Sequence, residues 1–461
     1  MNKLLRVALL PVVCAAAAVS LSGCGKSTPI ALTPAPPGPA DLGPAAGLST
    51  PPAGAVVFDL KYRAQTGGAE DIPYNSFWGY GGGQDEETKT NAFLAEVRQK
   101  ASHLYYVCNS SFTGRKWAAV EFHGRQASAL YFDLNADGKF EEDERILPTR
   151  QTGQGVEFIT PDFMQSLAGG GQTFCRVLLQ VNFYQGSSEP NCMWSPAALM
   201  EGAATLEGRP ARLLLFANSP GGRFDEYAAS DYALQLDDQM KVKAGIYLPR
   251  EALSSLIATE DRFYHLTLDG RRSNGLPARV VLVKDTSPTG ALAMKSASSN
   301  SLRLTLTSLY LRGTADKTVY LHMSGSKDKV TLPEGTYAMQ SGTASYGISN
   351  ANEWQVSFTQ GPQVMIKAGE TIELPLGQPI LTVRAIAERD RYNSKPAEKA
   401  VFKPGERIYL EPKIVGSGGE LFSRFSQKTN SQHQQLTDRP PQITITGPNG
   451  KPVLSQVMEY G

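Results

Sequence analysis

The sequence has few residues of the kinds that build catalytic or nucleic-acid-binding sites. Only five of its 461 residues are cysteine and five are histidine. They are scattered, so neither a Cys-x-x-Cys nor a His-Glu-x-x-His zinc motif occurs. A Gly-x-Ser-x-Gly nucleophile turn and a phosphate-binding glycine loop are absent as well. Without these motifs we can assign no catalytic residue. The formal net charge is +1 without a basic run, so we expect no nucleic acid partner.

Long hydrophobic runs are lacking too. The apolar stretch Val7–Val19 follows Lys3 and Arg6, and it is shorter than the about 20 residues that a membrane-spanning helix needs. This pattern is typical of a secretory signal peptide. The tetrapeptide that ends at Cys24, Leu-Ser-Gly-Cys, resembles the lipobox of bacterial lipoproteins. The resemblance implies that residues 1–23 are removed and that Cys24 carries fatty chains as a membrane anchor.

That resemblance also implies a location. An Asp after the lipidated Cys tends to retain such proteins at the inner membrane of Gram-negative bacteria, and Gly25 stands here instead. We therefore expect an exported, lipid-anchored protein of the cell envelope, with the outer membrane favoured. Fatty chains contribute about 0.8 kcal/mol for each buried methylene, which is enough to hold a folded domain at a bilayer.

Composition divides the remaining 438 residues into a tether and a folded part. Residues 24–55 are rich in proline, alanine and glycine, and such a segment forms an extended spacer rather than a core. The folded part has the length of two to four domains. We expect a first module, a second module, a β-sandwich and a C-terminal β domain, with the respective ranges 56–165, 166–290, 291–386 and 387–461.

The periodicity predicts a mostly β, multidomain protein with one short helix near its start. Apolar residues recur at helical spacing over Thr90–Tyr105. The segments Trp117–Phe122 and Ala127–Phe132 form a predicted β-hairpin. From Leu302 onward, short alternating segments are separated by Gly, Pro and Asn turns, which favours β-sandwiches of immunoglobulin-like or transthyretin-like type. The polar stretch Ser417–Arg439 is expected to be a loop.

The predicted hairpin has a second copy. When Thr205–Ala228 is aligned without a gap beneath Glu121–Glu144, eight positions are identical. They lie at the turn, on one face of the strands and in the loop that follows. Chance similarity between two hairpins is the alternative, and we favour a repeated supersecondary unit. The identical pairs are Gly124/Gly208, Arg125/Arg209, Ala127/Ala211, Leu130/Leu214, Phe132/Phe216, Gly138/Gly222, Phe140/Phe224 and Glu142/Glu226.

The loop after the first hairpin carries the clearest chemical pattern. Calcium prefers six to eight hard oxygen ligands at about 2.3–2.6 Å on a chain that wraps the ion. The sequence Asp133-Leu-Asn-Ala-Asp-Gly-Lys-Phe-Glu-Glu-Asp-Glu144 matches the calcium loop of EF-hands. By that resemblance Gly138 permits the sharp turn and Lys139 offers its carbonyl, while Glu141 binds directly or through water. The side-chain ligands implied are Asp133, Asn135, Asp137 and the bidentate Glu144.

Two departures limit this resemblance. Phe140 stands where EF-hands usually have Ile, Leu or Val, and the segment before the loop alternates as a strand. The match therefore covers only the loop, and it is similar to strand-entered calcium loops of uncharacterised exported bacterial proteins. Without a helix pair to open, the ion is expected to fix the loop in place. The second copy lacks the carboxylates but retains Gly222 at the turn and Phe224 as a buried apolar anchor, so we expect it to keep the loop's shape without an ion.

Three cysteines remain in the mature chain, and an odd number permits at most one internal disulfide. Cys175 and Cys192 are the closer pair, because they flank an apparent hairpin between Val177 and Asn191. They are our disulfide candidate, and whether Cys108 pairs stays open.

One aromatic, glycine-rich segment, Phe77–Gly83, could bind a glycan or could pack against its own sheet. Together these features favour a binding or structural component of the envelope with a glycan or protein ligand. The alternative is a carbohydrate-active envelope enzyme whose paired carboxylates are scattered along the sequence.

Overall fold

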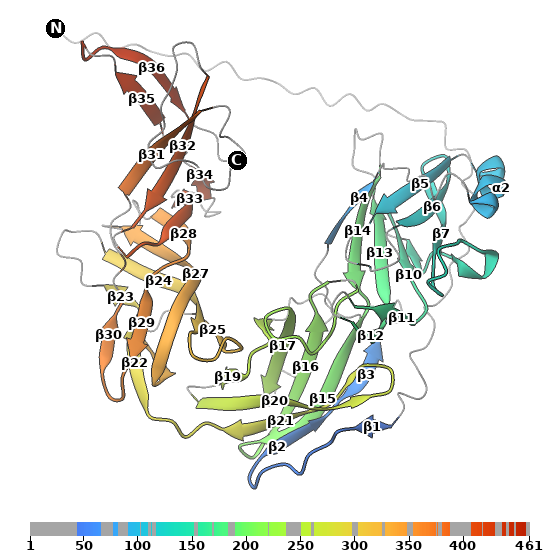
Figure 1. The fold of residues 1–461 in the computed structure, drawn as a ribbon, viewed down its shortest axis with the longest axis horizontal. Helices are drawn as coiled ribbons and strands as arrows, with labels where there is room; N and C mark the ends of the chain where they lie inside the picture. The colour runs from blue at the N-terminus through green and yellow to red at the C-terminus, as the bar shows by residue number, and fades with distance from the viewer. Residues whose placement is uncertain are drawn as a thin grey trace, which may run out of the picture.

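The computed structural model shows a chain built almost wholly from antiparallel β-sheets (Figure 1), which confirms the predicted mostly β, multidomain fold. Among the described residues the only α-helix is α2 (Ala92–Lys100), and no described helix has the length and apolarity needed to cross a membrane. The structure describes residues 44–65, 77–81, 91–101, 103–108, 112, 117–151, 155–167, 170–182, 190–219, 221–236, 250–259, 262–296, 303–324, 328–347, 354–374, 376, 380–387, 407–416, 418–428, 436–438, 442–446 and 449–457. The signal peptide, Cys24 and most of the predicted tether lie outside these residues.

The first large sheet has nine strands. One face holds an aromatic core in which Phe112, Phe132 and Trp194 contact each other edge to face or tilted. A two-stranded hairpin of β11 (Phe163–Ser166) and β12 (Gln172–Cys175) lies beside it. The nine strands, in spatial order, are β8 (Arg145–Ile146), β7 (Gln126–Phe132), β6 (Trp117–His123), β5 (His103–Cys108), β4 (Phe77–Gly81), β14 (Asn191–Pro196), β13 (Val177–Asn182), β10 (Gly155–Ile159) and β9 (Arg150–Gln151).

Helix α2 covers the other face of this sheet. The Asn91 side chain caps its N-terminus by accepting a hydrogen bond from the Leu94 N–H at 2.9 Å. Leu94 and Val97 are buried against the hairpin of β6 and β7. The helix ends at Lys100, so the predicted extension to Tyr105 is wrong. The residues from His103 instead form strand β5, whose alternate side chains are buried on the sheet.

Two five-stranded sheets pack face to face to form a sandwich. Phe58, Leu213, Leu215, Leu266 and Val280 contribute to its shared core. One sheet has the order β18 (Glu251–Ala252), β17 (Ser230–Leu236), β16 (Arg209–Ala217), β15 (Ala198–Leu206) and β3 (Lys61–Ala64). The other has the order β1 (Ala45–Ala46), β20 (Arg262–Arg272), β21 (Pro277–Lys284) and β2 (Val56–Asp59), with β19 (Leu256–Thr259) beside β20.

A buried ion pair joins the nine-stranded sheet to this sandwich. The Arg176 side chain is fully buried and donates two hydrogen bonds to Asp162, at 2.9 and 2.7 Å, and one to the Gln65 carbonyl at 3.2 Å. Tyr62 of β3 donates to the same carboxylate at 2.7 Å, and burial raises the pKa of its hydroxyl well above 10. The pairing of charge with multiple hydrogen bonds offsets the cost of burying both ions.

The C-terminal part combines a three-stranded and a ten-stranded sheet around a core of its own that includes Leu292, Leu309, Leu332, Val356 and Phe358. The small sheet has the order β26 (Lys329–Pro333), β22 (Thr289–Ala293) and β30 (Thr371–Glu373). The large sheet has β23 (Lys295–Ser296), β24 (Arg303–Gly313), β27 (Gly335–Gly347), β28 (Trp354–Thr359), β33 (Leu421–Lys428), β32 (Ile408–Val415) and β31 (Ile380–Ala387), with β25 (Tyr320–Ser324), β29 (Gln363–Ile366) and β34 (Leu436–Asp438) paired to its strands. A separate hairpin joins β35 (Gln442–Thr446) and β36 (Pro452–Val457).

The sheets join segments that were predicted to belong to different domains. Strand β10 lies before the expected boundary at residue 165 and pairs with β13 beyond it. Strand β33 likewise pairs with β28 across the expected boundary at residue 386, so the expected loop at Ser417–Arg439 contains a strand of the large sheet. Hydrogen bonding between strands is long-range, and periodicity does not reveal which strands pair.

Candidate functional site

The two predicted hairpins share a topology. Strands β6 and β7 form one and β15 and β16 form the other, and a loop then leads to a third antiparallel strand, β8 or β17. The turn residues differ by one position, because Gly124 is the first residue of its turn and Gly208 the second of its own. The loops at corresponding places, Asp133–Glu144 and 218–229, are here named the first loop and the second loop.

Asp133 organises the first loop from its buried position at the end of β7. Its Oδ1 accepts hydrogen bonds from the N–H groups of Ala136, at 2.6 Å, and Asp137, at 3.2 Å. Its Oδ2 accepts from the Gly138 N–H at 3.1 Å. Gly138 has φ of +81°, a left-handed conformation that favours glycine. The predicted sharp turn at the sixth position is therefore confirmed.

Glu144 closes the first loop from its other end and is also buried. Its Oε1 accepts hydrogen bonds from the Leu134 N–H at 2.7 Å and the Asn135 N–H at 3.2 Å. Its Oε2 is buried and has no hydrogen-bond partner. Burial raises the pKa of this carboxyl, and the charge of Asp133 acts in the same direction, while the backbone N–H groups act against them. An ionised Glu144 is thus incompletely compensated by the chain itself.

The other predicted ligands lie on the outer side of the loop. Asn135, Asp137, Lys139 and Glu141 are exposed. Asn135 Oδ1 accepts from the Asp137 N–H, and Asp137 Oδ1 accepts from the Lys139 N–H, both at 2.9 Å. Over the part of the chain that the structure describes, no three His, Cys, Asp or Glu side chains gather into a metal-binding group. The structure thus brings Asp133 and Glu144 to the inside of the loop and leaves the remaining oxygens at its rim.

Packing and charge hold the second half of the first loop and the strand that follows it. Phe140 is buried against α2 and the β6–β7 hairpin. Arg145, directly after Glu144, lies 3.8 Å from Glu121 and hydrogen bonds to the Tyr131 hydroxyl at 3.3 Å. Tyr131 donates to Glu121 at 2.9 Å, and burial raises the pKa of its hydroxyl to about 12. The exit strand β8 is thereby fixed to the hairpin.

In the second loop, the negative charge of Asp225 is compensated by an arginine of the same loop. Arg223 binds Asp225 through two hydrogen bonds, at 2.7 and 2.9 Å, and Phe224 between them is buried in the sandwich core. The apolar anchor therefore persists, as expected. The turn does not, because Gly222 lacks the positive φ of Gly138. The expectation that this loop keeps the shape of the first is wrong. Its backbone conformation at Gly222 differs, and the Arg223–Asp225 ion pair holds the segment instead.

The predicted disulfide is not formed. Cys108, Cys175 and Cys192 are present as thiols. The hairpin of β13 and β14 exists, but its register places Cys192 opposite Val181, whereas Cys175 precedes the start of β13. Cys175 lies six positions before Val181, and six residues of extended chain span about 20 Å. That separation is too large for a disulfide between Cys175 and Cys192. Burial raises the pKa of the Cys192 thiol to about 12.

The aromatic segment expected at Phe77–Gly83 is a strand in part. Residues Phe77–Gly81 form β4 between β5 and β14, which places the segment inside the nine-stranded sheet. A group of arginines that was not predicted from the sequence, Arg223, Arg271 and Arg272, lines a cavity beside the second loop. The adjacent arginines at the end of β20, Arg271 and Arg272, were a signal for it.

Comparison with known proteins adds no relative: no protein-family model, no curated protein and no solved structure matches this chain.

Proposed function

We propose that this chain is an exported, lipid-anchored envelope protein in which one calcium ion fixes the first loop. In this role the protein acts as a binding or structural component rather than as an enzyme. The observation that carries the calcium proposal is the buried Glu144 carboxylate, whose Oε2 lacks a partner while Asp133 lies buried at the other end of the loop. A buried charge of this kind requires compensation, and a divalent cation supplies it.

The donors of the loop fit calcium better than a softer metal, because all of them are oxygens. Asp133 and Glu144 would hold the ion from inside, and the rim residues Asn135, Asp137 and Glu141 would complete its ligands together with the Lys139 carbonyl. Backbone hydrogen bonds already restrain the oxygens of Asp133, Asn135 and Asp137, which lowers the entropy that binding must remove. Bound calcium supplies positive charge to this oxygen ring.

Thermal unfolding of the full chain tests the calcium proposal. Calcium at tenfold its Kd stabilises the folded loop by about 1.4 kcal/mol. The melting temperature of the part of the chain that contains this loop is therefore expected to be a few degrees higher in calcium than in chelator. Asp133→Asn keeps an acceptor for the Ala136 N–H but removes the charge, and it is expected to abolish this shift. Glu142→Gln, an exposed acid of the same loop with no assigned ligand role, is the matched control and retains it. Equal melting of the wild type in calcium and in chelator contradicts the proposal.

The anchor rests on the Leu21–Cys24 sequence and is tested separately. Cys24→Ala removes the only proposed acceptor of lipid. We expect the wild-type chain to incorporate labelled palmitate and to sediment with membranes, and the variant to do neither. Unchanged sedimentation and labelling of Cys24→Ala would overturn the lipid anchor without affecting the calcium loop.

A further inference from the structure

A cavity with an arginine-rich wall lies beside the second loop. It has a volume of roughly 550 Å³, within the range of small-molecule sites. Three segments far apart in sequence contribute to it. They are the second loop, the described residues at the facing ends of β11 and β12, and the end of β20 with the turn that follows it. Its polar side chains are Arg223, Arg271, Arg272, Gln172 and Ser273.

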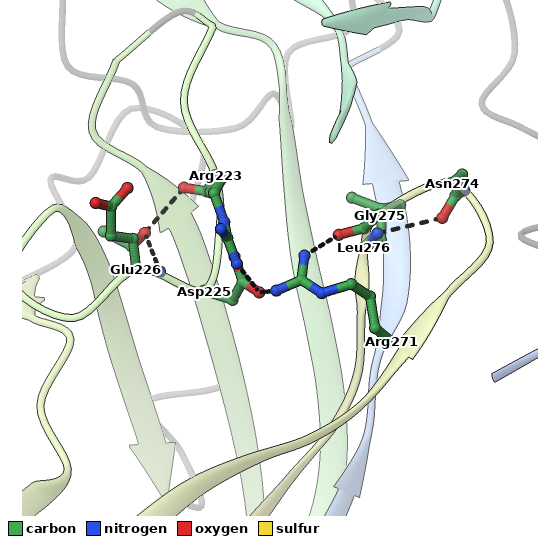
Figure 2. Close-up of polar contacts among 8 residues, drawn as sticks. Arg223, Asp225, Glu226, Arg271, Asn274, Gly275 and Leu276 are labelled. Carbon is green, nitrogen blue, oxygen red and sulfur yellow. Dashed lines mark hydrogen bonds and ion pairs between the residues drawn. The ribbon is translucent and has the colours of Figure 1, made fainter. Parts of the chain in front are cut away.

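One carboxylate positions two of these arginines. Figure 2 shows Asp225 between Arg223 and Arg271, with both guanidinium groups directed toward it. Arg271 also donates to the Gly275 carbonyl at 2.6 Å. These hydrogen bonds occupy two of the five N–H donors of each guanidinium. Both arginines are thus held in place with donors remaining.

The walls of the cavity are built from closely packed backbone. Gly275 has φ of +81°, and a Cβ atom there would lie 2.1 Å from the Gln172 carbonyl oxygen. The two hairpin turns therefore approach each other as only glycine allows. Gly170 and Gly171, in the facing turn, also have positive φ. The backbone that carries the arginines is therefore closely packed, and the hydrogen bonds of Arg223 and Arg271 restrain their side chains on it.

The charge that faces the cavity is positive. Of the ten described residues that line it, none is acidic and three are arginine. The Asp225 side chain is only 5% exposed, whereas those of Arg223 and Arg271 are 31% and 44% exposed. Asp225 raises the pKa of Arg223 through its hydrogen bond, and Glu226 adds to this effect. The Asp225 carboxylate thus lies behind the two guanidinium groups, and Glu226, which is exposed, is not among the described residues that line the cavity. A ligand in the cavity therefore meets the cations first.

We propose that this cavity binds a small polar molecule through an oxyanion group, a carboxylate, sulfate or phosphate. Guanidinium groups match such groups with paired, charge-assisted hydrogen bonds. Gln172 and Ser273 supply neutral polar contacts for the rest of the molecule. The site does not depend on the calcium loop, because its residues come from the sandwich and the β11–β12 hairpin.

Calorimetric titration of the full chain with inorganic phosphate, sulfate, glucuronate and glucose tests the proposal. We expect saturable binding of the three anions with Kd of about 1 mM or tighter, and no binding of glucose. Arg271→Gln is expected to weaken anion binding about tenfold or more, the loss that corresponds to one charge-assisted hydrogen bond. Ser273→Glu places a carboxylate at the site without removing an arginine and is expected to weaken binding by a similar factor.

Arg262→Gln is the matched control. Arg262 lies on the same strand as Arg271, has a similar exposure of 50% and pairs with Glu207 at 2.7 Å, but it does not line the cavity. Anion affinity is expected to change less than about twofold in this variant. The proposal is overturned if no anion binds, if glucose binds as well as glucuronate, or if Arg262→Gln weakens binding as much as Arg271→Gln does. Ser273→Glu decides the case if Arg271→Gln fails to fold.

Discussion

The first and second loops follow similar hairpins yet satisfy their charges in opposite ways. In the first loop Asp133 and Glu144 are buried and are served mainly by backbone N–H groups. In the second loop Asp225 is almost buried and is served by two arginine side chains. A buried carboxylate keeps its charge only if hydrogen bonds and a positive partner compensate for its lost hydration. The second loop carries that partner in its own chain, and we propose that the first obtains it from solution as calcium.

The largest expected effect concerns what the loops share. Phe140 and Phe224 are both buried anchors, and replacing either by alanine is expected to destabilise its module by about 3–5 kcal/mol in urea unfolding. The variants should differ in calcium binding, which Phe140→Ala weakens and Phe224→Ala leaves unchanged. If Phe224→Ala also weakened calcium binding, the ion would not be confined to the first loop.

The next effect is expected for Glu144→Gln, whose change in melting temperature should have opposite signs in chelator and in calcium. Its pKa is raised by burial, so without calcium the carboxyl favours the folded state while it is protonated. The ordinary pKa of a glutamate carboxyl is 4.5. The contribution to stability is lost as the pH rises above that value and through the raised pKa of Glu144. In chelator at pH 7, Glu144→Gln should therefore melt at or above the wild-type temperature. In calcium it should melt a few degrees below the wild type, because the ion needs the ionised form. A variant that is less stable by the same amount in both buffers contradicts this.

The smallest effect separates the two turn glycines. Gly138→Ala places a Cβ atom on a residue with φ of +81° and is expected to cost about 1–2 kcal/mol. Gly222 lacks positive φ, and an added Cβ would meet chiefly the Ser219 Oγ at 2.3 Å. That hydroxyl is able to rotate away, so Gly222→Ala should cost under about 1 kcal/mol. Urea unfolding of the two variants gives the comparison, and equal costs would mean that the backbones do not differ as described.

Local features of the fold could be predicted from the sequence. The start of α2, the β6–β7 hairpin and the burial of both phenylalanine anchors depend on neighbouring residues, and each was correct. The residues after Lys100 were assigned to the helix because Leu104 continues its spacing, but pairing with β6 makes them a strand. The polar sequence around Ser423 concealed β33, since that strand alternates within a sheet whose partners are distant in sequence.

The candidate sites were predictable to different degrees. The first loop is contiguous, so its residues and its turn glycine could be read from spacing alone. The cavity beside the second loop could not, because Arg223 and Arg271 are 48 positions apart in the sequence and share Asp225 only after the sheets have paired. The disulfide proposal failed for the same reason, since the register of β13 and β14 decides which residues face each other.

The most direct test of the central claim is the number of calcium ions that the full chain binds, measured by calorimetric titration. We predict one site per chain, with a Kd of about 10⁻⁴ to 10⁻³ M, as for extracellular calcium modules. Asp133→Asn and Glu144→Gln should each weaken it at least about tenfold, which corresponds to about 1.4 kcal/mol, while Glu142→Gln leaves it unchanged. Absence of binding by the wild type, or binding that both variants retain, would contradict the account.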